Sequence, residues 1–286
     1  MEAEAAAGAP AKKKSRAGRD LPAALIVGFS LFFLVIAAFL WFPVGVPIIL
    51  SLLSILGVFE LHSALALAGM SSARAPLAVL TPAIIISGCA QLWDPRLEVL
   101  PWGLTGLAVL TVLLWRLPGG AEGYTKDAAA SLFTIGYLAL LGSFIGPVLA
   151  LPDGAVKLGL IFMCVCASDT GGYALGASLG KHQMAPNISP KKTWEGLVGS
   201  FLLGAVVGGL VAEFALHVPW WIGVLLSVIM TLFGTAGDLV ESMIKRDVGI
   251  KDMSSTLPGH GGIMDRIDSY LVGIPVGWAF FTIAAL

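Results

Sequence analysis

Residues 195–240 read EGLVGSFLLGAVVGGLVAEFALHVPWWIGVLLSVIMTLFGTAGDLV, which is two apolar runs separated near Pro219. The runs cover 195–217 and 219–240. An α-helix rises ~1.5 Å per residue, so about 20 residues cross the ~30 Å hydrocarbon core of a bilayer. The stretch therefore predicts two consecutive transmembrane helices.

The composition of the whole chain supports the same interpretation. Of 286 residues, 57% are hydrophobic and 12% are charged, whereas soluble domains have roughly 25% charged residues. A water-soluble fold of this length could not bury so much apolar surface. Short polar segments divide the apolar sequence into nine predicted spans: 21–42, 44–68, 76–93, 98–117, 128–150, 155–179, 195–217, 219–240 and 269–286. We therefore expect an all-α fold, a polytopic transmembrane helical bundle of about nine spans.

The distribution of basic residues predicts the orientation of these spans. If the N-terminus is cytosolic and the chain alternates, all but two of the 17 Lys and Arg lie on the cytosolic side. The two exceptions are Arg96 and Lys157. Cytosolic loops of membrane proteins are enriched in Lys and Arg, so this topology is favoured. It gives a disordered basic cytosolic tail at 1–20, N-terminal transmembrane helices at 21–150, and a C-terminal transmembrane region at 151–286, which we expect to be the catalytic one from the polar residues described below. That last region has cytosolic loops at about 180–194 and 241–268.

Cysteine content and absent motifs argue against several other classes. The formal net charge of -1 says nothing about nucleic acids, and we expect no nucleic-acid partner. The cysteines Cys89, Cys164 and Cys166 lie in apolar stretches without Cys-x-x-Cys spacing, so we predict no disulfide framework and no zinc site. The sequence has no Walker A, Gly-x-Ser-x-Gly or His-Glu-x-x-His motif.

The densest polar segment runs from Gly237 to Asp268. Asp238 and Glu241 are three residues apart, as are Asp265 and Asp268, so each pair can share one face of a helix. Asp238 ends one predicted span and Asp265 precedes the next. We expect these two carboxylates to converge on one hard cation, because carboxylates, waters and substrate phosphates suit Mg²⁺. The basic residues of the segment offer donors to phosphate oxygens; they are Lys245, Arg246, Lys251 and Arg266.

A glycine-rich stretch, Pro258–Gly262, lies inside this segment. Its glycines permit positive φ and a close approach of backbone N–H groups to a phosphate. His260 lies between them and can donate to a phosphate. Together these features favour phosphoryl or nucleotidyl transfer, in which positioning and charge stabilisation provide most of the catalysis. The alternative is a solvated membrane-surface loop held by internal ion pairs.

A second polar cluster surrounds Asp169 and the run Ser189–Lys192. Asp169 lies within a predicted span, where a carboxylate is costly and therefore a functional candidate. Its alternative role is structural, with its hydrogen bonds satisfied inside the bundle. Lys191 and Lys192 can bind phosphate, determine topology or contact anionic lipid. Glu60 interrupts the second span and is either satisfied within the bundle or directed toward the site.

Residues 242–268, SMIKRDVGIKDMSSTLPGHGGIMDRID, closely resemble the signature of the phosphatidate cytidylyltransferase family. The upstream stretches SDTGGYALGASLGKH and ISPKKTWEG resemble that family's other motifs, in the same order. Residues of about 160–270 carry the resemblance. It implies the reaction of CTP with phosphatidic acid, a membrane lipid, to give CDP-diacylglycerol and pyrophosphate for phospholipid synthesis. It also implies Mg²⁺ bound by Asp238 and Asp265 and, more weakly, a second cation such as K⁺. A homodimer is expected from the family and from small-residue helix faces.

The expected site follows from this resemblance together with the charge pattern. The residues expected to be catalytic are Asp238, Asp265, Lys245, Arg246, Arg266 and Asp268. The residues expected to bind substrate are Lys251, Asp252, His260, Gly261, Gly262, Ser189, Lys191, Lys192 and Asp169. The protein is expected to be an integral, multi-pass cell membrane protein whose active site faces the cytosol, where CTP is found.

Two other functions stay open at this point. A CTP-dependent lipid kinase of the dolichol or phytol type would transfer the γ-phosphate to an alcohol, and would release CDP. An ion-coupled transporter would use intramembrane acids such as Glu60, Asp169 and Glu213, and would show broken helices and inverted repeats. The sequence shows no convincing internal repeat, and its charges gather at one face, which argues against transport.

Overall fold

The computed structural model describes residue 42 and the ranges 44–256 and 261–286. The predicted basic tail and nearly all of the first predicted span lie outside the described residues, as does His260. Within the described residues, seven helical stretches are long and apolar enough to cross a membrane. They correspond to the second through the eighth predicted spans. The bundle predicted from the apolar runs is therefore confirmed for this part of the chain.

The helices of the N-terminal half are shorter and more interrupted than those of the C-terminal half. The N-terminal elements are α2 (Gly45–Leu67), α3 (Arg74–Ser87), α4 (Leu100–Trp115), α5 (Tyr124–Thr134), α6 (Leu141–Ser143) and α7 (Ile145–Leu149). A π-helical segment, η4 (Ile135–Leu140), joins α5 to α6. The 3₁₀ turns are η1 (Ala90–Leu92), η2 (Pro95–Val99) and η3 (Leu117–Gly119). The C-terminal helices are α8 (Gly154–Leu179), α9 (Trp194–Phe214), α10 (Trp220–Asp247) and α11 (Met264–Ile283).

Two features of the C-terminal half differ from the sequence-based expectation. The predicted loop at about 180–194 contains a two-stranded antiparallel hairpin, β1 (Gln183–Ala185) and β2 (Ser189–Thr193). Helix α10 continues to Asp247, past the predicted end of its span, and its last turn carries Lys245 and Arg246. Cations are favourable at the negative end of a helix dipole. The helix therefore ends only before Gly249, whose φ of 76° is a left-handed value that favours glycine.

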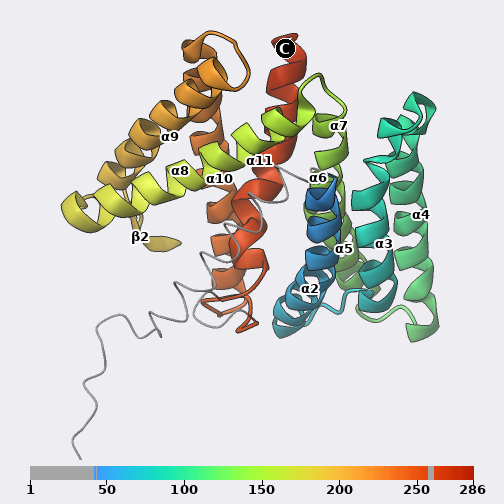
Figure 1. Ribbon diagram of the computed structural model, residues 1–286. Coiled ribbons are helices and arrows are strands. Elements are labelled where there is room, and N and C mark those ends of the chain that lie inside the picture. Colours follow the sequence, from blue (N-terminus) through green and yellow to red (C-terminus); the bar gives the residue numbers. More distant parts are fainter. Residues whose placement is uncertain (1–41, 43, 257–260) are drawn as a thin grey trace, which may run out of the picture.

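Helices α10 and α11 lie in the middle of the molecule, with α9 on one side and α2 to α7 on the other (Figure 1). Helix α8 crosses the view at a steep angle to α10 and α11 (Figure 1). It packs against α9 at glycines, because a Cβ on Gly171 would collide with the carbonyl oxygen of Gly199. Such close approach of backbones is what small residues permit between membrane helices.

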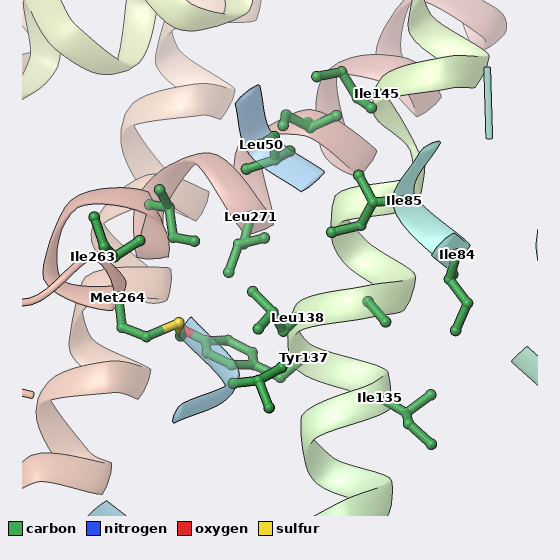
Figure 2. Close-up of a cluster of buried hydrophobic side chains, with 14 of the residues drawn as sticks. Leu50, Ile84, Ile85, Ile135, Tyr137, Leu138, Ile145, Ile263, Met264 and Leu271 are labelled. Carbon is green, nitrogen blue, oxygen red and sulfur yellow. The ribbon is translucent and has the colours of Figure 1, made fainter. Parts of the chain in front are cut away.

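The core between the two halves forms around the start of α11. Figure 2 shows Tyr137 and Leu138, from the π-helical segment, directed toward Met264 and Leu271 of α11. Helix α2 comes close at Gly57, where a Cβ would lie 3.1 Å from the sulfur of Met264 and 3.2 Å from a methyl carbon of Leu138. The N-terminal helices therefore contact the first turn of α11 directly.

Candidate active site

A cavity of about 310 Å³ lies among α8, the hairpin, α9, α10 and α11. Its polar lining comprises Ser168, Asp169, Ser189, Lys191, Lys192, Thr193, Ser200, Thr235, Asp238 and Ser269. Residues from both polar clusters of the sequence meet here, since Asp169 and the hairpin lysines face the same space as Asp238. The structure thus brings five of the predicted site residues together: Asp169, Ser189, Lys191, Lys192 and Asp238.

An ion pair connects the hairpin to α10 at the wall of this cavity. Lys192 Nζ lies 2.6 Å from Asp238 Oδ2 and donates to the Thr235 carbonyl oxygen at 3.4 Å. Asp238 Oδ1 accepts a 3.3 Å hydrogen bond from Ser242 Oγ. The two charged side chains are 23% and 36% exposed, so both remain accessible from the cavity. A phosphate oxygen entering the cavity can therefore exchange with the carboxylate as the partner of Lys192.

A second, deeper ion-pair group lies where α10 faces the start of α11. Lys245 Nζ is 2.7 Å from Asp265 Oδ1 and 3.3 Å from Glu241 Oε1, and all three side chains are largely buried. Asp265 Oδ2 accepts hydrogen bonds from the backbone N–H groups of Met253, at 2.9 Å, and Gly262, at 2.8 Å. Both oxygens of Asp265 are therefore engaged by the protein, and they fold the segment between α10 and α11 back onto α10.

The acids of the two helices pair differently from the expected convergence of Asp238 with Asp265. The charges of Glu241 and Asp268 act on each other across the two helices, and the charge of Asp238 acts on Asp268. Lys245, the partner of Asp265, is seven residues after Asp238, which is ~10 Å along a helix. Asp268, rather than Asp265, lies beside this part of α10, since a Cβ on Gly237 would lie 3.1 Å from the Asp268 carbonyl oxygen.

The other predicted residues surround these two groups. The Arg246 side chain donates from Nε to the Ile188 carbonyl and from Nη1 to the Ile250 carbonyl, both at 3.0 Å, so it ties the hairpin turn to the end of α10. Lys251 and Asp252 are exposed just beyond it. Arg266 is also exposed, and its charge acts on Asp169.

The glycines of the signature have distinct reasons to be glycine. Gly261 has a φ of 84°, as the glycine-rich pattern predicts for a position that disfavours other residues. Gly262 donates its backbone N–H to Asp265, so that group is bonded within the protein. The proposed contact of this N–H with a phosphate would need the bond to Asp265 to open.

Two residues of the N-terminal half reach the site in ways that sequence reasoning missed or left open. Glu60 on α2 contacts the segment that leads into α11. Tyr137, on η4, is buried, and its hydroxyl has no hydrogen-bond partner among the described residues. The charges of Glu241 and Asp268 act on that hydroxyl. Glu60 gave a sequence signal as an acid within an apolar span, whereas Tyr137 gave none, because a π-helical segment depends on packing.

The geometry fits a hard cation only in part. Among the described residues, no group of three or more His, Cys, Asp or Glu side chains is arranged to hold a metal ion. Asp238 fits a ligand role because it is accessible from the cavity and one of its oxygens has only a long hydrogen bond. Asp265 would have to release Lys245 or a backbone N–H before it could bind a metal. The assignment of both residues to Mg²⁺ stays a prediction.

The fold and the site together define a polytopic integral membrane protein with a polar cavity lined by lysines and carboxylates. The chain belongs to the Cytidylyltransferase family, whose sequence profile matches residues 22–284. That match extends well beyond the 160–270 region in which the motifs lie, and it includes the helices that carry Glu60 and Tyr137.

Similar proteins of this family include bacterial phosphatidate cytidylyltransferases. The protein of Mycobacterium bovis is 37% identical over 96% of this chain and 92% of its own length. That of Mycobacterium leprae is 35% identical over 95% of this chain and 91% of its own length. That of Staphylococcus epidermidis is 38% identical over 52% of this chain and 57% of its own length.

Proposed function

We propose that this protein transfers the cytidylyl group of CTP to phosphatidic acid, giving CDP-diacylglycerol and pyrophosphate. The observation that carries the proposal is the similarity over 96% of the chain to proteins named phosphatidate cytidylyltransferase. The cavity supports it, because lysines beside an accessible carboxylate suit phosphate groups. The acyl chains of the lipid stay in the bilayer, so a cavity between membrane helices is a suitable place for its headgroup.

The reaction requires little covalent help from the protein. A phosphate oxygen of phosphatidic acid, which is anionic at pH 7, attacks the α-phosphorus of CTP. A P–O bond forms there while the bond to the bridging oxygen of pyrophosphate breaks, and no proton has to be removed first. Catalysis then rests on positioning and on stabilising the charge of the leaving group. Lys191 and Lys192 at the cavity wall, with Arg266 near Asp169, are the residues we assign to charge neutralisation.

A divalent cation is part of the proposal. Asp238 is the residue best placed to hold Mg²⁺ with the triphosphate, and Asp265 would join it only after a change of partners. When bound, Mg²⁺ would withdraw charge from the pyrophosphate leaving group. The second cation, such as K⁺, and the association of two copies remain predictions from the family resemblance.

A direct assay tests the proposed function. Purified protein is incubated with CTP labelled in its α-phosphate, phosphatidic acid and Mg²⁺. We expect a labelled lipid and free pyrophosphate. Release of CDP together with a phosphorylated alcohol, when a polyprenol replaces phosphatidic acid, would instead identify a lipid kinase. Ion uptake into vesicles without any lipid product would identify a transporter.

The proposed cytosolic orientation predicts a labelling pattern. The three native cysteines are buried or half-buried, so a new exposed cysteine gives a clear signal. Asp247→Cys, at the end of α10 near the site, should react with a membrane-impermeant maleimide only after cells are opened. Glu98→Cys, in the exposed η2 segment between two spans, should react on intact cells. The reverse pattern would place the active site on the outer face.

A further inference from the structure

Glu60 is a buried carboxylate that lies far in sequence from the segment it contacts. It is 5% exposed and belongs to α2, in the N-terminal half. Its Oε1 accepts hydrogen bonds from Ser254 Oγ, at 2.6 Å, and from the Ile263 backbone N–H, at 3.0 Å. Its Oε2 accepts from the Met264 backbone N–H, at 2.9 Å. The carboxylate therefore binds the stretch before α11 at one side-chain and two backbone donors.

These contacts place the carboxylate at the start of α11. The first backbone N–H groups of a helix have no partner within the helix, and the N-terminal end of its dipole is positive. Glu60 supplies both an acceptor and a negative charge there, from another helix. These N–H donors and the positive helix end stabilise the negative charge of Glu60.

Glu60 and Asp265 together fix the course of the signature segment. Asp265 accepts hydrogen bonds from the backbone N–H groups of Met253 and Gly262. Glu60 accepts from the next residue in each case, namely the Ser254 hydroxyl and the Ile263 N–H. Gly262 fits between the two acids, since a Cβ there would lie 2.6 Å from Glu60 Oε2. The next residue after the contact at Met264 is Asp265 itself, and Asp268 follows one turn later.

We propose that Glu60 is a positioning residue of the active site. It sets the position of the first turn of α11, and hence of Asp265 and Asp268 against α10, without contacting the substrate. This inference rests on the proposed function for its catalytic consequence, but not for its structural one. It also gives α2 a role in the active site, although α2 lies outside the charged signature segment at residues 242–268.

The test compares Glu60→Gln with the wild-type protein. Glutamine keeps the size but has one oxygen, so its NH₂ group would face either the Ile263 or the Met264 N–H. We expect amide hydrogen exchange in residues 261–268 to become faster, and kcat to fall by up to about 100-fold, as a misplacement near 1 Å can produce. The KM for CTP should change less than about threefold, because a positioning residue provides no uniform binding of substrate. Glu60→Ala should give faster amide hydrogen exchange in residues 261–268 and a lower kcat than Glu60→Gln.

Asp127→Asn is the matched control. Asp127 is also a buried carboxylate of the N-terminal half, and it accepts from the Ser71 N–H and from Arg116, each at 2.6 Å. Its replacement should lower the unfolding temperature while leaving kcat and exchange in residues 261–268 unchanged.

Unchanged exchange in 261–268 for Glu60→Gln, or an equal loss of kcat in Asp127→Asn, would overturn the inference. Normal turnover of Glu60→Gln despite faster exchange would overturn it as well. If the wild-type protein makes no CDP-lipid, the proposed function fails, and the exchange comparison still decides whether Glu60 fixes the segment.

Discussion

Replacing Asp265 by asparagine is expected to lower kcat by about 10³-fold, the scale on which preorganised polar groups of active sites act. Asp265 is bound by Lys245 Nζ and by the N–H groups of Met253 and Gly262. An asparagine offers one oxygen and one NH₂ group, so whichever way it turns, the NH₂ faces a donor. The variant should still fold, because Lys245 keeps Glu241 as a partner. Turnover by the purified variant, measured with saturating CTP, gives the size of the effect.

The same variant separates two roles for Asp265. If it is a Mg²⁺ ligand, the Mg²⁺ concentration for half-maximal activity should rise in Asp265→Asn. If it only organises the signature segment, kcat should fall with that concentration unchanged. The geometry favours the second outcome, because both oxygens are already engaged by the protein. Asp247→Asn, which changes an exposed carboxylate at the end of α10, should keep normal turnover. Normal turnover by Asp265→Asn would remove the residue from the site altogether.

Apolar runs predicted the membrane spans because length and hydropathy are local properties of the chain. The seven spanning stretches of the described residues begin and end within a few residues of the predicted ones at most boundaries. The end of α10 was less predictable. Lys245 and Arg246 look like loop residues in a hydropathy pattern, but they suit the last turn of a helix. The hairpin at 183–193 was missed because its residues are mostly polar and its strands are short.

The partners of the site residues depend on how the helices pack against one another. The periodicity of a single sequence carries no information about that packing. The spacing of Asp265 and Asp268 correctly indicated a shared helix, but it could not tell which of them would lie beside Asp238. The ion pair of Lys245 with Asp265 follows from the register between α10 and α11. The contact of Glu60 with Ser254 joins residues 194 positions apart, and one sequence gives no sign of such a pairing.

The largest loss of stability is expected for Lys245→Met. Lys245 is 9% exposed, and its ammonium group lies between Glu241 and Asp265. Methionine fills a similar volume but leaves two carboxylates buried close together without a cation. Removing one partner of a buried ion pair costs about 3–5 kcal/mol of unfolding free energy, because the remaining charge is uncompensated. Thermal unfolding in detergent, followed by size-exclusion chromatography, should show a large fall in the midpoint.

Lys157→Met is the informative comparison, because Lys157 is even less exposed, at 3%. Its ammonium group lies 5.6 Å from the centre of the Phe281 ring and, among the described residues, it is in no ion pair. A cation–π contact contributes about 0.5–2 kcal/mol, and losing it removes a charge without leaving another one unpaired. The midpoint of Lys157→Met should therefore stay near that of the wild type.

Adding Glu241→Gln to Lys245→Met should recover part of the lost stability, since it removes one of the unpaired charges. Two outcomes would contradict this account: equal effects of the two lysine substitutions, or no recovery in the double variant. Either would mean that stability at the junction of α10 and α11 depends on burial of the lysine side chain and not on its pairing with the two acids.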